Sequence, residues 1–426
     1  MYMKRTLLTF GILAVTMLLS CVASAKNIAG YPTVDGWAYT VYDDGTAELT
    51  SAPGATGAVV IPETITYEGN TYTVTRLGFS LFDSNVNITA IQLPSGLKEL
   101  GGRALAWCTN LETVTGGPEE LENISQYNFV DSKWMANQPD GPVYFKKWLI
   151  GCNGTYSEDV FAMPEGTIGM MMFGKYKGIQ SKVFRIPASV AYIPANTLTD
   201  FYNGLQYLER FEVDEANKFF FNDEVGAIYS KNRLAQAHGV DYTGISFDAL
   251  PIANPVKVYN VLPGTKIIST DALNTNGMEQ FNVPEGVEYI GHNVFRTNPP
   301  KNIDLPSTIK EMNACFYSAK QTETVVLRAA TVPAYTYTLF DFCSHITLYV
   351  PDASVDAYKA VAEFARVKQI LPMSQYLAVK DITGGETSAE VTAIYGIDGS
   401  VRTALQPGIN IVRYSDGTAR KVMHRE

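Results

Sequence analysis

The stretch Asn302-Ile303-Asp304-Leu305-Pro306 places apolar residues two apart and a proline directly after them. Variants of this phrase recur along the chain as Ile91-Gln92-Leu93-Pro94, Phe184-Arg185-Ile186-Pro187, Gln280-Phe281-Asn282-Val283-Pro284 and Thr347-Leu348-Tyr349-Val350-Pro351. Pro164 and Pro187 lie 23 residues apart, and Pro284 and Pro306 lie 22 apart. A fixed period near 22 residues indicates a protein built from stacked repeats.

A second phrase places Asn or Cys three residues after an apolar residue, ahead of the strand. The members of this set are Asn85, Cys108, Asn276, Asn298 and Cys343. An inward Asn or Cys where the chain bends can pair with backbone groups that would otherwise lack a partner. We interpret this set as a structural corner ladder.

Apolar residues at period two predict a short strand with one buried face, and the following proline ends it. One such unit cannot bury its own apolar face, but stacked units share a continuous core. The sequence therefore predicts a mainly β or α/β fold: a right-handed solenoid with one short strand per coil of about 22 residues.

The unit resembles the leucine-rich repeat of the BspA-like bacterial surface proteins. The resemblance covers about residues 60–373, and its best matches are Ile61-Pro62-Glu63-Thr64-Ile65, the run from Val283 to Phe295, and Leu305-Pro306-Ser307-Thr308-Ile309. It implies a cell-surface protein that binds its partner without catalysis.

Four other stretches break the 22-residue period and are interpreted as separate elements. The first two are hairpins inserted near residues 140–156 and 219–236. The others are an N-terminal β cap over 26–59 and a C-terminal β tail over 374–426, and a helix over 354–366 closes the last coil. The tail is similar to small C-terminal domains of exported Bacteroidetes proteins, some of which are sorting signals.

Residues 1–25 read as an export signal, with a basic start, an apolar stretch and a small-residue cleavage site at Ala23-Ser24-Ala25. An alternative is a lipobox ending at Cys21, which would then carry a lipid anchor. Either interpretation places the protein outside the cytoplasm, secreted or at the cell surface. No later stretch is long and apolar enough for a membrane span.

The composition excludes several classes of function. The chain carries 33 Lys+Arg against 43 Asp+Glu, a balance that argues against a nucleic-acid binder. With 4 His and 5 Cys in 426 residues, a zinc or haem enzyme is not expected, and no catalytic or phosphate-binding motif is present. We therefore predict no catalytic residue, no cofactor and no metal.

Two groups of reactive side chains leave alternatives open. Cys152 and Cys315 lie outside the corner ladder and could be free or paired. Carboxylates at Asp214-Glu215 and Asp223-Glu224 are interpreted as solvated loop residues, with a calcium site as the alternative.

The side chain between the two inward apolar residues of each strand should face outward. This predicts one exposed row of Gln92, Arg185, Asn282, Asp304 and Tyr349, with a neighbouring row of Gln280, Asn302 and Thr347. Tyr335 and Tyr337 are further candidate ligand-binding residues, because tyrosine is enriched in protein interfaces.

These rows point to non-catalytic recognition of a host protein, another cell or a glycan. A structural or assembly component of the bacterial surface is the alternative, and a hydrolase is a remote one.

Overall fold

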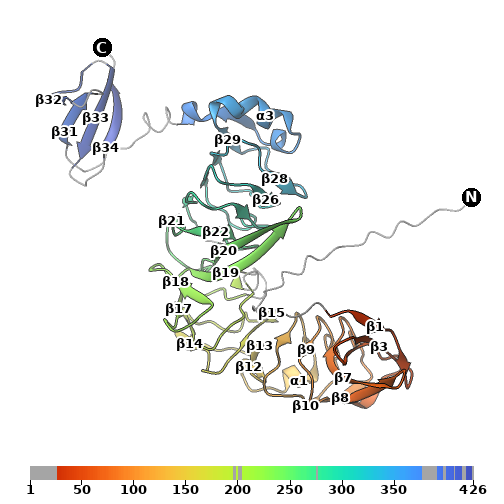
Figure 1. The fold of residues 1–426 in the computed structure, drawn as a ribbon. Helices are drawn as coiled ribbons and strands as arrows, with labels where there is room; N and C mark the ends of the chain where they lie inside the picture. Colours follow the sequence, from red (N-terminus) through yellow and green to blue (C-terminus); the bar gives the residue numbers. More distant parts are fainter. Residues whose placement is uncertain are drawn as a thin grey trace, which may run out of the picture.

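The computed structural model describes residues 26–194, 198–199, 204–274, 277–376, 391–396, 400–406, 408–414 and 419–424. The predicted signal segment with Cys21, and the corner residue Asn276, lie outside this part of the chain. From Lys26 to Tyr376 the chain winds into stacked coils that follow a bend, and four strands near the C-terminus form a separate small sheet (Figure 1).

Strands that precede the repeat prolines, together with strands at the same place in coils that lack the proline, stack in parallel on one side of the coils. They form three sheets, which we call the outer series. These are β5 (Gly57–Val60), β8 (Ile88–Leu93) and β10 (Thr113–Gly116); β14 (Val160–Ala162), β16 (Val183–Ile186) and β17 (Arg210–Val213); and β21 (Val258–Asn260), β23 (Gln280–Asn282), β25 (Asn302–Leu305), β27 (Thr324–Leu327), β29 (Thr347–Val350) and β30 (Gln369–Pro372).

Each regular coil contributes a second strand after its proline, which the prediction of one strand per coil lacked. Most of these strands, here the inner series, also pair in parallel. They are β7 (Asn70–Leu77), β9 (Glu99–Leu100), β11 (Asn123–Ile124), β13 (Trp148–Asn153), β15 (Gly169–Lys175), β20 (Val240–Ala249), β22 (Thr265–Ile268), β24 (Tyr289–Ile290), β26 (Glu311–Asn313) and β28 (Ala334–Thr336). Figure 1 shows β9, β15, β20 and β26 toward the inside of the bend and β8, β14, β17 and β21 toward the outside.

The core lies between the two series and consists of three large clusters in succession along the stack, drawn from residues 39–171, 149–249 and 227–370. In the C-terminal half, Phe281, Phe295, Phe316 and Phe340 are fully buried, and the rings of Phe316 and Phe340 stack 5.0 Å apart. Coils approach closely where the inner strand ends: a Cβ added at Gly101 would lie 2.5 Å from the carbonyl oxygen of Leu77. The mainly β solenoid predicted from the sequence is therefore confirmed.

Antiparallel strands occur at the N-terminal end and in two insertions. The N-terminal strands are β1 (Ile28–Gly30), β2 (Thr33–Val34), β3 (Trp37–Tyr42) and β4 (Thr46–Ser51), with β6 (Thr64–Tyr67) paired to β7. The first insertion contains α1 (Lys133–Ala136) and β12 (Gly141–Phe145), which pairs with β13.

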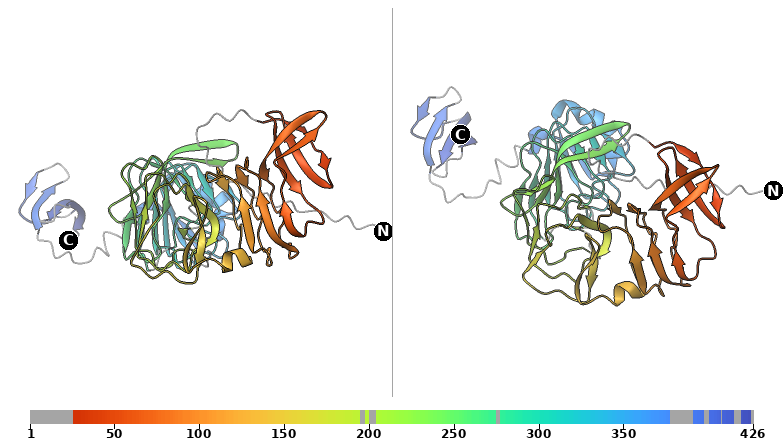
Figure 2. Two further views of the ribbon diagram at one scale, coloured as in Figure 1. Left: turned by 90° about the horizontal axis from the view of Figure 1, so that it is seen from below. Right: turned by 60° about the horizontal axis from the view of Figure 1, so that its bottom comes forward.

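The second insertion differs from the predicted hairpin. Most of the range predicted as a hairpin near 219–236 belongs to β18 (Phe220–Asn222) and to one long strand, β19 (Ile228–Ala237), which pairs with β18 and with β20. The turn comes at His238-Gly239, where both residues adopt positive φ. Figure 2 shows this β19–β20 hairpin standing out from the stacked coils.

The predicted helix over 354–366 is wrong in extent. The segment consists of η1 (Asp352–Ser354), α3 (Val355–Ala360) and η2 (Phe364–Arg366), because Val361 adopts extended backbone angles and ends α3. Tyr358 and Phe364 are buried at this end of the core, whereas Ala362 and Ala365 are exposed.

The C-terminal sheet has the strand order β32-β31-β33-β34. Its strands are β31 (Val391–Gly396), β32 (Val401–Arg402), β33 (Gly408–Tyr414) and β34 (Ala419–His424). No helix in the described part of the chain is long and apolar enough to cross a membrane.

Candidate functional site

The exposed face of the outer series carries two parallel rows of polar side chains between β21 and β30. The registers align Asn260, Asn282 and Asp304 in one row, and Gln280, Asn302 and Thr324 in the next. Further along, β29 and β30 extend these rows with Tyr349, Thr347 and Gln369. The apolar neighbours Phe281, Ile303 and Leu348 are buried, so this stretch has the inward and outward faces that the sequence predicts.

Side chains within these rows are bonded to one another. Gln280 Nε2 donates to Asn282 Oδ1 over 2.8 Å, and Asn282 Nδ2 donates to Asn260 Oδ1 over 2.7 Å. The Arg328 guanidinium holds Asp304 in a bidentate pair at 2.8 and 2.7 Å, and this contact raises the pKa of Arg328. These contacts fix the orientation of the polar groups before any ligand arrives.

The row that begins with Asn260, Asn282 and Asp304 is interrupted on β27 and then ends in an aromatic pair. Val326 occupies the register position between Asp304 and Tyr349 and is buried. Tyr349 is half-buried, and its ring lies 5.0 Å from that of Tyr376. The face therefore offers amides and a paired carboxylate at one end and aromatic rings at the other.

The single predicted row through Gln92 and Arg185 is wrong. Both side chains are exposed, but Gln92 lies in the β10-β8-β5 sheet and Arg185 in the β14-β16-β17 sheet, apart from the sheet of Asn282. The irregular segments that follow β10 and β17 break the outer series into three sheets. Arg185 Nε is bound to Glu212 Oε2 at 2.7 Å beside a shallow hollow of about 310 Å³.

Tyr335 lies in β28 of the inner series and Tyr337 directly follows that strand, so neither extends the candidate face. Tyr335, in β28, packs against the core with its ring 6.1 Å from Phe364. Tyr337 is 69% exposed and makes an edge contact with His292.

The corner residues pair with backbone groups of neighbouring coils. Cys108 Sγ donates to the carbonyl of Phe82 over 3.1 Å, and Cys343 Sγ donates to the carbonyl of Phe316 over 3.0 Å. Asn85 Nδ2 donates to the carbonyl of Ala55. Asn298 differs, since it contacts side chains of both neighbouring coils: its Nδ2 donates to Asn274 over 3.5 Å, and its Oδ1 accepts from Gln321 Nε2 over 3.4 Å.

The thiols are unsuited to nucleophilic catalysis because burial keeps them protonated. Burial raises the pKa of Cys108 and of Cys152 to about 11, and it also raises the pKa of Cys343 and Cys315. All four are free thiols, so Cys152 and Cys315 do not pair.

The acidic residues around β18 stabilise turns. Asp223 Oδ1 accepts the backbone N–H of Ala227, and its Oδ2 accepts the hydroxyl of Tyr259. Asp214 Oδ1 accepts the N–H of Ala216. Within the described ranges, no three or more His, Cys, Asp or Glu side chains form a group that could hold a metal ion.

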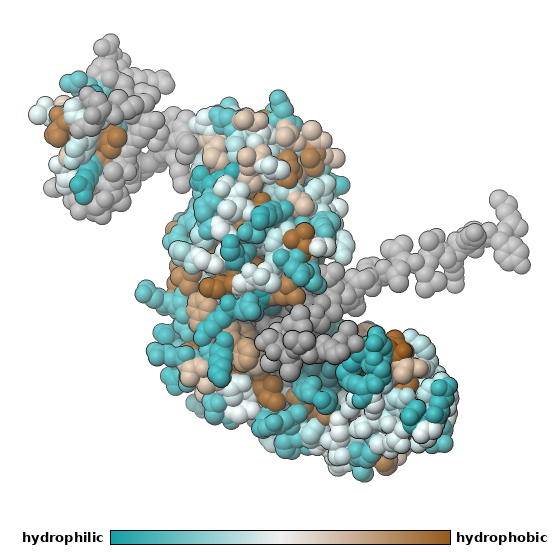
Figure 3. Space-filling model, viewed as in Figure 1, coloured by the Kyte–Doolittle hydropathy of each residue, from teal (hydrophilic) through white to brown (hydrophobic). Residues whose placement is uncertain are grey.

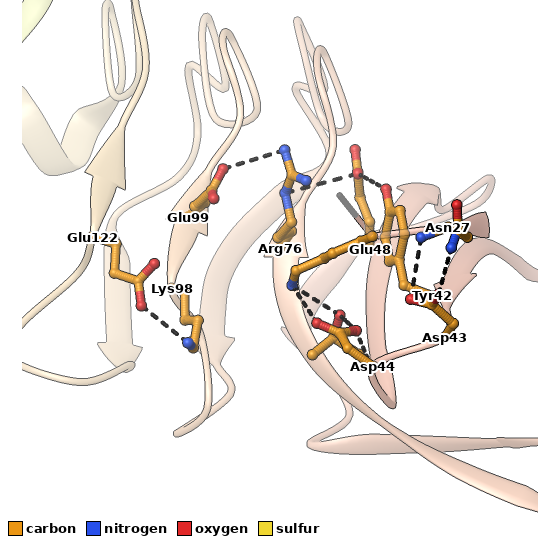
Figure 4. Close-up of polar contacts among 11 residues, drawn as sticks. Asn27, Tyr42, Asp43, Asp44, Glu48, Arg76, Lys98, Glu99 and Glu122 are labelled. Carbon is orange, nitrogen blue, oxygen red and sulfur yellow. Dashed lines mark hydrogen bonds and ion pairs between the residues drawn. The ribbon is translucent and has the colours of Figure 1, made fainter. Parts of the chain in front are cut away.

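The inner series carries a second polar face that sequence reasoning missed. In the N-terminal half this face is a ladder of opposite charges: Arg76 lies 3.9 Å from Glu48 and 3.2 Å from Glu99 (Figure 4). In the C-terminal half Asp248, Glu311 and Asn313 are buried there instead. In the sequence, Glu99 and Glu311 each lie five residues after a repeat proline, which was the available signal.

Hydrophilic side chains are interspersed with apolar ones over the face shown in Figure 3.

Residues 63–137 and 265–362 match six copies of the BspA type leucine rich repeat region. The chain therefore contains BspA-type leucine-rich repeats, which confirms the resemblance drawn from the sequence.

Solved structures of bacterial leucine-rich repeat proteins are similar to most of the chain. A leucine-rich cell surface protein from Faecalibacterium prausnitzii is 16% identical, covering 83% of this chain and 98% of its own, with a TM-score of 0.40. A leucine-rich repeat protein from Eubacterium ventriosum is 17% identical, covering 80% and 84%, with a TM-score of 0.42. The pneumococcal vaccine antigen PcpA is 12% identical, covering 81% and 99%, with a TM-score of 0.37. No curated protein matches the sequence.

Proposed function

We propose that this protein recognises a protein or glycan outside the cell, without catalysis, through the outer-series face between β21 and β30. The observation that carries this proposal is the chain of hydrogen bonds from Gln280 through Asn282 to Asn260, which links the two polar rows on one parallel sheet. Asn302, Asp304 and Tyr349 complete the proposed contact surface.

The geometry suits many weak contacts made at low ordering cost. The amides are anchored on strands and by one another, so little side-chain entropy is lost on binding. Each amide still has unused donor or acceptor capacity, because an Asn or Gln side chain offers two donors and two acceptor lone pairs. The face has no basic stripe, which favours protein or glycan over nucleic acid.

Export, secretion or surface attachment, and a sorting role for the C-terminal sheet, belong to the same proposal. Their support is the sequence pattern of residues 1–25 and the strand pattern of 391–424.

The test is capture of the full chain on an array of extracellular-matrix proteins and glycans. Asn282→Ala should weaken capture by at least about fivefold, the loss that marks an energetically important interface residue. Asn70→Ala, an exposed asparagine on β7, is the matched control and should bind like the unchanged chain. Both variants should keep the unfolding temperature of the unchanged chain.

Equal capture by Asn282→Ala and the unchanged chain would contradict the proposal. Copurification in stoichiometric surface assemblies, with no capture on the array, would favour the structural alternative.

A further inference from the structure

Three buried oxygen atoms on the inner series lack hydrogen-bond partners among the described residues. They are Glu311 Oε1 and Asn313 Oδ1 on β26 and Thr336 Oγ1 on β28. Glu311 is 1% exposed and Asn313 is 7% exposed. Buried polar atoms are nearly always paired, so a group of unpaired ones indicates an occupant.

The backbone brings these three side chains together on one face. Glu311 and Asn313 lie two apart on β26, and Met312 between them points into the core. Asn313 and Thr336 are register partners on adjacent parallel strands. Strand geometry therefore separates the three positions by about 5 Å across the sheet and about 7 Å along it.

The carboxylate of Glu311 has no lysine or arginine partner among the described residues. Its Oε2 meets His238 Nδ1 at 2.9 Å, and His238 is half-exposed at the tip of the β19–β20 hairpin. Nearby Lys266 and Lys310 are both engaged by Glu288. A buried carboxylate is costly unless it is paired with a cation.

Asp248 shows how the same face satisfies a carboxylate fully. It is 2% exposed, and Arg233 Nε lies 2.9 Å from its Oδ1. Ser269 and Ser230 donate hydroxyl hydrogen bonds to its two oxygens. Glu311 has no equivalent of Arg233 in the described part of the chain.

We propose that Glu311, Asn313 and Thr336 bind a hard metal cation of the calcium type. A carboxylate, an amide carbonyl and a hydroxyl are all oxygen ligands, which such cations prefer, and water would complete the coordination shell. The three atoms are closed to solvent, which suits a single ion better than a larger ligand. With one carboxylate, affinity belongs to the range of extracellular modules, about 10⁻⁴–10⁻³ M.

The cation would also secure the hairpin, because Glu311 holds the hairpin tip through His238. Ala237 and Tyr242 of the hairpin pack on Ile267 and Tyr289, and Asn313 Nδ2 donates to the Tyr289 hydroxyl over 3.3 Å. The ligands and the hairpin contacts therefore share one small cluster.

Thermal unfolding of the full chain in 5 mM CaCl₂ and in EDTA tests the proposal. Calcium should raise the unfolding temperature by about 2 °C or more, as expected for a ligand at several times its dissociation constant. Glu311→Gln keeps the side-chain shape, removes the charge and should abolish the shift. Glu288→Gln, a charged position on the neighbouring coil, is the control and should retain it.

Three further measurements test the proposal even if Glu311→Gln is unstable. Thr336→Val should weaken the calcium response with little change of volume, and Asn313→Asp should lower the calcium midpoint by roughly tenfold because it adds a carboxylate. Calcium should also slow hydrogen exchange of residues 235–242 in the unchanged chain.

No response to calcium in the unchanged chain, or an equal response in Glu311→Gln, would overturn the proposal. The niche formed by Glu311, Asn313 and Thr336 would then hold only water. Because this niche lies on the inner series, its failure would leave the proposed recognition face untouched.

Discussion

Two segments of nearly identical sequence occupy the same place in different coils, yet their final glutamates have different surroundings. The segments are Leu93-Pro94-Ser95-Gly96-Leu97-Lys98-Glu99 and Leu305-Pro306-Ser307-Thr308-Ile309-Lys310-Glu311. Each runs from an outer strand to an inner one. The Glu99 side chain is 32% exposed, whereas that of Glu311 is 1% exposed.

The neighbouring coil causes this difference. Arg76 is the register partner of Glu99 on the preceding strand and pairs with it, whereas Tyr289 is the register partner of Glu311. The β19–β20 hairpin then places His238 against Glu311. The repeat sets the position of a side chain, and the adjacent coil sets its chemistry.

Mutations in the shared core should affect both coils alike and by the largest amount. Leu100 and Met312 follow the two glutamates, and both are fully buried. Leu100→Ala and Met312→Ala should each lower the free energy of unfolding by about 2–5 kcal/mol. Chemical denaturation measures this free energy. A large effect at one site with none at the other would contradict the claim that the two positions are equivalent in the core.

The corner thiols should also behave alike, because both donate to a carbonyl of the preceding coil. A thiol with a pKa of about 11, as at Cys108, is about a hundredfold less ionised at pH 8 than one near 9. Iodoacetamide should therefore label Cys108 far more slowly in the native chain than in urea. The native rate should rise as the pH increases toward 11, which mass spectrometry of labelled peptides can follow.

Fast native labelling of Cys108 at pH 8 would show that its corner is open. Cys343, at the same repeat position, serves as the internal comparison, since burial raises its pKa as well.

The surface charge ladder should contribute least. Arg76 and Glu99 are each about one-third exposed, so Arg76→Gln and Glu99→Gln should have a coupling energy of about 0.2–1 kcal/mol, reduced by salt. A double-mutant cycle by urea denaturation at low and high salt measures this. A coupling well above that range, or one insensitive to salt, would contradict a screened surface pair.

The regular coils could be predicted from the sequence because a proline directly follows outer strands such as β25 and β29. Ile303, Leu305, Phe281 and Val283 are buried as predicted. Inner strands such as Tyr289–Ile290 have two residues, too few for a visible period of two. Breaks in the outer series also escaped prediction, since they depend on how irregular segments pack.

The buried niche could not be predicted, because the segment ending in Glu311 looks the same as the one ending in Glu99. Its burial depends on the β19–β20 hairpin, whose turn at His238-Gly239 lies beyond the hairpin predicted near 219–236. Long-range contacts of this kind have no local signal. The outward orientation of Asn282, Asp304 and Tyr349 could be predicted, because it depends only on the alternation of apolar and polar residues along each strand.

The comparison of Tyr349→Ser with Tyr337→Ser tests the recognition account most directly, since these tyrosines lie on the outer and inner series. Dissociation constants for the array component that captures the chain would be measured by surface plasmon resonance. Tyr349→Ser should weaken binding by about tenfold or more, and Tyr337→Ser should leave it unchanged. Loss of binding in Tyr337→Ser with normal binding in Tyr349→Ser would place recognition on the inner series and contradict the account.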